Sequence, residues 1–174
     1  VARLVDDGSI DTLASQYEGR RLNSPNDLDV RADGSIYFTD PPYGVDDSER
    51  ELDFSGVYRL HPDGRLELLT TAFSRPNGIT FSPDETRLYV NDSQETLVRV
   101  YDVAPDGSIS NGRVFAEPSD ADAQGTTDGM EVDEAGNLYT TGPGGVWIYA
   151  PDGTLLDRID VPAASTNLAF GGED

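Results

Sequence analysis

Asn77-Gly78-Ile79-Thr80-Phe81 is the middle copy of a motif that occurs three times and decides the fold. The first copy is Asn26-Asp27-Leu28-Asp29-Val30, and the third is Asp128-Gly129-Met130-Glu131-Val132. Successive copies are 51 residues apart. Each copy opens with a short side chain that carries an oxygen and continues as an alternating strand pattern. An equal period of this length, filled by short strands and glycine turns, is typical of β-propeller blades.

The segments between the motif copies repeat the layout of a propeller blade. In the first period the motif runs into a turn at 32–35, a returning strand at 36–40, a long acidic loop at 41–55, and outer strands at 57–60 and 66–69. The second and third periods keep this order of strands and turns. Helical periodicity is weak throughout, because glycine or proline interrupts most candidate windows.

These periods predict an all-β protein that forms one incomplete propeller. The 174 residues hold about 3.4 periods, fewer than the roughly four to eight blades that close a ring. We therefore expect a single partial β-propeller of about three to three and a half blades. Its expected units are the end of a blade at 1–25, blades at 26–76, 77–127 and 128–166, and the start of another blade at 167–174. Both ends cut a blade open, so we expect a fragment of a longer protein, with open blade edges that invite self-association.

Composition narrows the range of partners. The chain has 33 acidic and 12 basic residues, a net charge of −21, and no lysine or cysteine. Such a field repels phosphate backbones and anionic lipid, which argues against nucleic acid and membrane partners, and it attracts divalent cations. The acidic residues are spread over many turns, a distribution that favours a halophilic, solvated surface over an acidic tail. With no bilayer-spanning apolar stretch and no signal-peptide layout, we expect a cytoplasmic location.

Propeller geometry brings the motif positions together. The first strand of each blade lines the central channel and the second runs antiparallel to it, so the start of the first and the end of the second share one rim. Asn26, Asn77 and Asp128 are therefore expected around one mouth of the channel, with Asp40 and Asp92 close behind. Carboxylate and amide oxygens without His or Cys suit calcium, and magnesium less well. The alternative is that each Asx residue only makes a turn, but three at equal spacing favour a metal site.

The rim has two further candidate residues. Tyr43 lies on the long loop at the same rim and is a candidate substrate contact, although it could equally pack on the loop prolines. Arg75 precedes Pro76 and is a candidate to touch substrate or to pair with a rim carboxylate. The alternative is that Arg75 is an ordinary surface residue.

The sequence also resembles a known family. The segments that carry the likeness are Asn23-Ser24-Pro25-Asn26-Asp27, the run from Ser35 to Gly44, Arg75-Pro76-Asn77-Gly78, Ser82-Pro83-Asp84, Asp128-Gly129-Met130 and the run from Gly142 to Trp147. They are similar to the gluconolactonase branch of the regucalcin/gluconolactonase family. The resemblance covers nearly the whole chain. It implies a six-bladed propeller, a divalent metal, usually calcium, at the channel mouth, and hydrolysis of sugar lactones.

Carried over residue by residue, the resemblance implies roles for three positions. Asn77 and Asp128 become metal ligands, with Asp128 also the general base, and Asn26 sits at the metal or against the substrate. The family takes a further ligand, a glutamate, from a blade that precedes this chain. Thr127 stands where the family usually has proline. Magnesium, manganese and zinc remain open beside calcium, as do two other functions: a related ester or organophosphate hydrolase, and a non-catalytic propeller that calcium holds rigid for partner binding.

Overall fold

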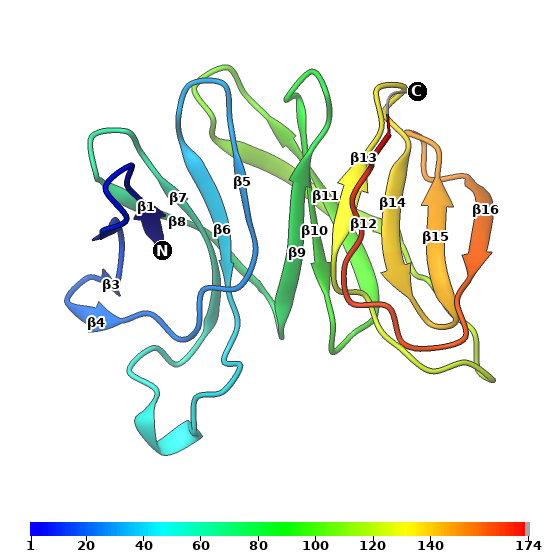
Figure 1. Ribbon diagram of the computed structural model, residues 1–174, viewed down its shortest axis with the longest axis horizontal. Coiled ribbons are helices and arrows are strands. Elements are labelled where there is room, and N and C mark those ends of the chain that lie inside the picture. The colour runs from blue at the N-terminus through cyan, green and yellow to red at the C-terminus, as the bar shows by residue number, and fades with distance from the viewer. Residues whose placement is uncertain (173–174) are drawn as a thin grey trace.

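The computed structural model describes residues 1–172 and consists almost entirely of antiparallel strands. Three sheets of four strands stand side by side in chain order, and two short hairpins precede them (Figure 1). The hairpins are β1 (Ala2–Leu4) with β2 (Ile10–Thr12), and β3 (Gln16–Tyr17) with β4 (Arg20–Arg21). Among the described residues only η1 (Asp47–Glu49) is helical, and no helix there has the length and apolar character needed to cross a bilayer.

Each large sheet is a simple meander in which every strand pairs with the next one along the chain. The first contains β5 (Leu28–Val30), β6 (Ile36–Asp40), β7 (Ser55–Leu60) and β8 (Leu66–Phe73). The second contains β9 (Pro76–Phe81), β10 (Arg87–Asp92), β11 (Leu97–Val103) and β12 (Ile109–Ala116). The third contains β13 (Met130–Val132), β14 (Leu138–Gly142), β15 (Gly145–Tyr149) and β16 (Leu155–Asp160). The all-β prediction is confirmed, and the meanders have the form of propeller blades.

The tight turn between the first two strands of each blade needs one residue in the left-handed backbone conformation. Gly34 takes this conformation in the first sheet, with a φ of 83°, and Gly136 takes it in the third, with a φ of 86°. The second sheet has Glu85 there instead, at a φ of 54°. Glycine adopts this region without steric penalty, whereas a residue with a Cβ does so rarely. The turn therefore keeps its shape in all three sheets, although its sequence differs.

The core lies between neighbouring sheets, and the alternation along β10 shows how it forms. Leu88 and Val90 face the first sheet and pack in a cluster with Tyr37, whereas Tyr89 faces the third sheet and packs with Leu138. These five side chains are at most 1% exposed. Side chains alternate between the faces of a strand, so a blade buried on both faces needs apolar residues on both. Burial of each large side chain stabilises the fold by about 1.5–3 kcal/mol.

Side chains near the ends of the second strands join each blade to the motif of the next. Thr39 Oγ1 donates a hydrogen bond to the backbone oxygen of Asn77, with a separation of 2.7 Å. Asn91 Nδ2 likewise donates to the backbone oxygen of Asp128, at 2.6 Å. These bonds fix the motif residues at one end of the sheets, the end from which the β6–β7 loop projects (Figure 1).

The segment that follows the third sheet lies beside its first strand. The backbone oxygen of Thr166 accepts a hydrogen bond from Gly129 N at 2.8 Å, although residues 161–172 form no strand. This is where the sequence predicts a further blade to begin, at 167–174. The last two residues of that range lie outside the described part of the chain.

Candidate active site

A cleft of ≈440 Å³ opens at the end of the sheets where the three motif copies begin. Its lining contains every residue predicted from the sequence as a metal ligand and both predicted substrate contacts. The residues that line it are Asn26, Tyr43, Arg75, Asn77, Ser93, Gln94, Thr126 and Asp128. They come from all three blades, so the cleft depends on how the blades are arranged relative to one another.

Asn77 is the most unusual polar group of the cleft. Its side chain lies at the start of β9 and the residue is only 6% exposed. Nδ2 donates to the hydroxyl of Tyr43 at 3.3 Å, but Oδ1 accepts no hydrogen bond from residues 1–172. The buried amide of Asn91 differs, because its Oδ1 accepts from Gly78 N at 3.0 Å and its Nδ2 also has a partner. Asn77 thus brings to the cleft lining an amide oxygen that no hydrogen bond of the described residues occupies.

Asp128 is held by its backbone, which leaves its carboxylate available. Its N–H donates to Thr141 Oγ1 at 2.9 Å, and its backbone oxygen accepts from Asn91. No arginine forms an ion pair with its carboxylate within residues 1–172. Burial raises the pKa of Asp128; a hydrogen bond from the Asn77 side chain opposes this rise, and the negative charge of Asp27 adds to it. A partly desolvated carboxylate of this kind can bind a cation or accept a proton.

Gly78 allows Asn77 and Asp128 to approach each other. A Cβ atom on Gly78 would lie 2.2 Å from the backbone oxygen of Asp128 and 2.8 Å from Asn91 Nδ2. Both separations are too short for a real side chain. The glycine after Asn77 is therefore required by the close approach of the next motif copy.

The remaining predicted contacts lie at the margin of the cleft. Asn26 is exposed, and its backbone N–H donates to the oxygen of Thr39 at 2.9 Å. The guanidinium of Arg75 lies over the ring of Tyr43, with its Cζ atom 6.0 Å from the ring centroid. Arg75 is also exposed and has no ion-pair partner in the described part of the chain. It brings a positive charge to a protein whose net charge is −21.

Asp40 and Asp92 do not line the cleft. They are 0% and 1% exposed and lie at the ends of β6 and β10. Asp40 accepts from the backbone N–H groups of Asn23 and Ser24 at 2.9 and 2.7 Å. Asp92 accepts from Ser74 N at 2.6 Å and from the next backbone N–H in the chain. Both carboxylates thus fix the segment that leads into a motif copy.

The sequence reasoning did not find Ser93, Gln94 or Thr126. Ser93 follows Asp92 directly, its hydroxyl contacts that of Tyr43, and its backbone oxygen accepts from Thr126 Oγ1. The position of Ser93 in the sequence could have identified it, because a residue just beyond the end of a second strand lies on the same rim as the motif.

The donor set of the cleft fits a hard cation. It offers the Asp128 carboxylate, the vacant Oδ1 of Asn77 and the exposed amide of Asn26, all oxygen donors. Calcium and magnesium prefer such donors, whereas zinc prefers nitrogen and sulfur. Residues 1–172 contain no cluster of three or more His, Cys, Asp or Glu side chains placed to hold a metal ion. Amide oxygens would therefore be essential to any cation site here.

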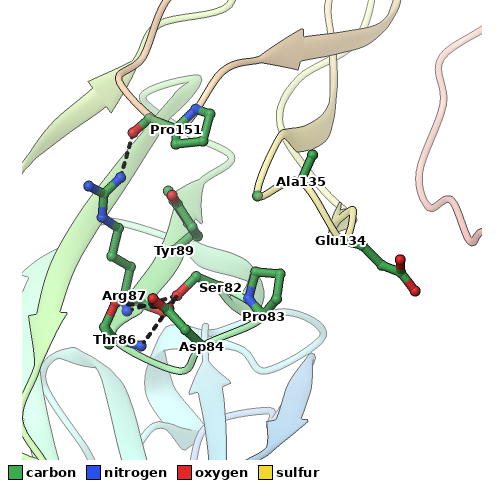
Figure 2. Close-up of a pocket in the computed structure, with 10 residues that line it drawn as sticks. Ser82, Pro83, Asp84, Thr86, Arg87, Tyr89, Glu134, Ala135 and Pro151 are labelled. Atoms are coloured by element: carbon green, nitrogen blue, oxygen red, sulfur yellow. Dashed lines mark hydrogen bonds between the residues drawn. The ribbon is translucent and has the colours of Figure 1, made fainter.

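A second cleft, of ≈310 Å³, lies at the opposite end of the sheets (Figure 2). It separates the β9–β10 turn from the β13–β14 turn. Two of its charged groups are engaged within the fold: the Arg87 guanidinium donates to the backbone oxygen of Pro151, and Asp84 accepts from Ser82 Oγ. None of the residues predicted from the sequence as site residues lines this cleft.

Comparison with known proteins gives one family and several relatives. The family described as "SMP-30/Gluconolactonase/LRE-like region" matches residues 1–174. A gluconolactonase of Zymomonas mobilis is 43% identical over 171 residues, which cover 91% of this chain and 48% of that protein. An L-arabinolactonase of Azospirillum brasilense is 38% identical over 151 residues, covering 83% of this chain and 49% of that protein. A solved gluconolactonase structure from Xanthomonas campestris is 40% identical with a TM-score of 0.85, and the match covers 97% of this chain and 57% of that one. The chain thus spans about half the length of these relatives.

Proposed function

Because the chain belongs to the SMP-30/gluconolactonase/LRE-like family, we propose that the protein hydrolyses a sugar lactone with the help of a divalent cation. The observation that carries this proposal is the cleft in which Asn77 and Asp128 face each other across two blades. The relatives act on lactones of different sugars by their names, so the proposal extends to the class of sugar lactones. We further propose that the three sheets are consecutive blades of a six-bladed ring, with boundaries at 26, 77 and 128.

The cation would be held by Asn77 and Asp128, with Asn26 at the cation or against the substrate. We propose calcium, because these ligands are oxygens and two of them are neutral amides, with magnesium, manganese and zinc as alternatives. When bound, the cation would supply a Lewis acid that polarises the lactone carbonyl. The strongly acidic surface also favours divalent cations over anions at long range.

The protein's own side chains would transfer the proton of the attacking water and orient the substrate. Water adds to the carbonyl carbon, and Asp128 takes one of its protons through a carboxylate oxygen that is not used for ligation. The ring C–O bond breaks, the ring oxygen receives the proton that Asp128 had taken and becomes a hydroxyl, and the product is a hydroxy acid. Arg75 and Tyr43 flank the opening, where the Arg75 charge can attract the carboxylate that forms. Asp40 and Asp92 act indirectly by fixing the chain on either side of the cleft.

Two other functions use the same residues. A related ester or organophosphate hydrolase would keep the cation and Asp128 but accept a different electrophile. A non-catalytic propeller would use the cation to stiffen the rim for partner binding.

The test compares Asp128→Asn with Asp6→Asn in the full-length protein. Asp6 is exposed in the β1–β2 turn, so its substitution changes the net charge equally without touching the cleft. Hydrolysis of gluconolactone and arabinolactone is followed with a pH indicator, with and without calcium, after subtraction of the spontaneous rate. We expect Asp128→Asn to lower the rate by about 10²-fold or more, as for other general bases, and Asp6→Asn to leave it unchanged. Full activity of Asp128→Asn contradicts the proposal, and an inactive wild type that still binds calcium favours the binding module.

A further inference from the structure

A chain of hydroxyl groups leads from the buried amide of Asn77 to a backbone oxygen. Asn77 Nδ2 is 3.3 Å from the Tyr43 hydroxyl, which in turn contacts the hydroxyl of Ser93. Ser93 Oγ donates to the backbone oxygen of Arg75 at 3.4 Å. The same backbone oxygen also accepts from Ser93 N at 3.0 Å, so the backbone and the hydroxyl of Ser93 both donate to it. The chain therefore ends on a fixed acceptor.

The last acceptor favours one direction for the hydrogen bonds in the chain. A backbone oxygen can only accept, so the single proton of the Ser93 hydroxyl points toward Arg75. Ser93 Oγ is then left to accept, and the single proton of Tyr43 points toward Ser93. The Tyr43 oxygen is left to accept in turn, and the group that donates to it is the amide nitrogen of Asn77. In the reverse direction the Ser93 hydroxyl would donate to Tyr43, and its hydrogen bond to the backbone oxygen of Arg75 would be lost.

This direction distinguishes the two orientations of the Asn77 amide. A rotation of the amide by about 180° exchanges Oδ1 and Nδ2 with little change in shape, so sterics alone select weakly between them. Only the oxygen can bind a cation, since the NH₂ group has no free lone pair. In the observed orientation Nδ2 donates to Tyr43 and also faces the carboxylate of Asp128, whereas Oδ1 has no hydrogen-bond partner within residues 1–172.

We propose that Tyr43 is a positioning residue that, through Ser93 and together with the Asp128 carboxylate, holds the Asn77 amide with its oxygen available to the cation. The inference rests on the proposed function for its cation, but the orientation of the amide is a property of the protein itself. It gives the β6–β7 loop a specific task, because Tyr43 is the residue through which that loop reaches β9. Thr126 Oγ1 adds support by donating to the backbone oxygen of Ser93. These contacts thus join the β6–β7 loop to the β10–β11 turn and to the segment that leads into the third motif copy.

The test is a double-mutant cycle on calcium affinity in the full-length protein, measured by calorimetry. Tyr43→Phe removes one of the two acceptors that face Nδ2 and is expected to raise the calcium dissociation constant about two- to tenfold, the worth of one hydrogen bond. In the Asn77→Asp background both terminal atoms are oxygens, so the same substitution should change the constant by less than about twofold. An equal effect of Tyr43→Phe in both backgrounds overturns the proposal. Tyr149→Phe, in the core of the third sheet, is the matched control and should leave the constant unchanged.

Ser93→Ala tests the direction of the chain. Without Ser93 Oγ the Tyr43 proton can turn toward Asn77 and stabilise the flipped amide, so we expect calcium affinity to fall at least as much as in Tyr43→Phe. An unchanged affinity overturns the proposal.

A measurement without metal separates this inference from the proposed function. In the metal-free protein, Tyr43→Phe and Ser93→Ala should both shift the side-chain NH₂ resonances of Asn77 in a ¹⁵N-resolved NMR spectrum, whereas Tyr149→Phe should not. If the wild type neither binds calcium nor hydrolyses lactones, the proposed function fails while this shift still supports the positioning role. If calcium binds and the resonances stay in place, the positioning role fails alone.

Discussion

Gly78→Ala should damage the cleft although it adds only a single methyl group. The added Cβ would lie 2.2 Å from the backbone oxygen of Asp128, whereas ordinary contact begins at 3.4 Å. The β9 and β13 segments must therefore separate by about 1 Å, and such a displacement at a reaction centre costs roughly 10²-fold in rate. The same overpacking is expected to lower the free energy of unfolding by about 1–3 kcal/mol. Gly78 has no left-handed φ, so the effect is steric and not a matter of backbone conformation.

The assay pairs lactone hydrolysis with thermal unfolding in the full-length protein. Gly171→Ala is the matched control, because no atom lies within 4 Å of the added Cβ. We expect kcat/KM to fall about 10²-fold in Gly78→Ala while Gly171→Ala stays within about twofold of the wild type. If Gly78→Ala unfolds at a lower temperature yet keeps its kcat/KM, the close approach serves packing alone and our reasoning about the cleft is wrong.

Three further changes test other parts of the structure. Removal of calcium with a chelator should lower the thermal midpoint, because calcium at a hundredfold excess over its Kd adds about 2.7 kcal/mol to the free energy of unfolding. In a calorimetric scan of Asp128→Asn, this shift should be absent. Asp92→Ala leaves the N–H of Ser74 without its partner and should reduce stability in urea by about 3 kcal/mol, with weaker calcium binding. Burial opposes ionisation of Asp33, but hydrogen bonds from Ser35 and the charges of Arg31 and Arg59 hold its pKa below the usual value. The ionised carboxylate therefore stabilises the fold at any pH above the usual pKa of aspartate. Asp33→Asn should therefore destabilise the protein at pH 7 by no more than about 1 kcal/mol, given 41% exposure, and the difference in thermal midpoint should vanish as the pH falls through the folded pKa.

The sequence predicts the strands well because strand and turn formation is largely local. Alternation at Leu88, Tyr89 and Val90 indicates a blade buried on both faces, and the repeat period fixes the order of strands. The meeting of Asn77 and Asp128 at one cleft also follows from the sequence, since equal spacing in a repeat places equivalent residues at equivalent positions. These predictions needed no knowledge of side-chain orientation.

The contacts among the loops could not be predicted in this way. Tyr43 lies in a loop without a counterpart of equal length in the other two blades, so the repeat says nothing about where its hydroxyl points. Ser93 becomes significant only because it lies between that hydroxyl and the backbone oxygen of Arg75. Such a chain depends on side-chain rotamers from two blades, which no periodic pattern encodes.

The residue after each motif asparagine or aspartate explains how the blades meet at the channel. In the second and third copies it is glycine, and a neighbouring segment occupies the space of the missing side chain: the backbone oxygen of Asp128 at Gly78, and the side chain and Cα of Asn167 at Gly129. In the first copy it is Asp27, whose carboxylate accepts from Ile79 N at 3.1 Å and so joins the first sheet to the second by a side chain. Gly78 brings the backbones of Asn77 and Asp128 together, and this close approach would let the two side chains share the proposed cation.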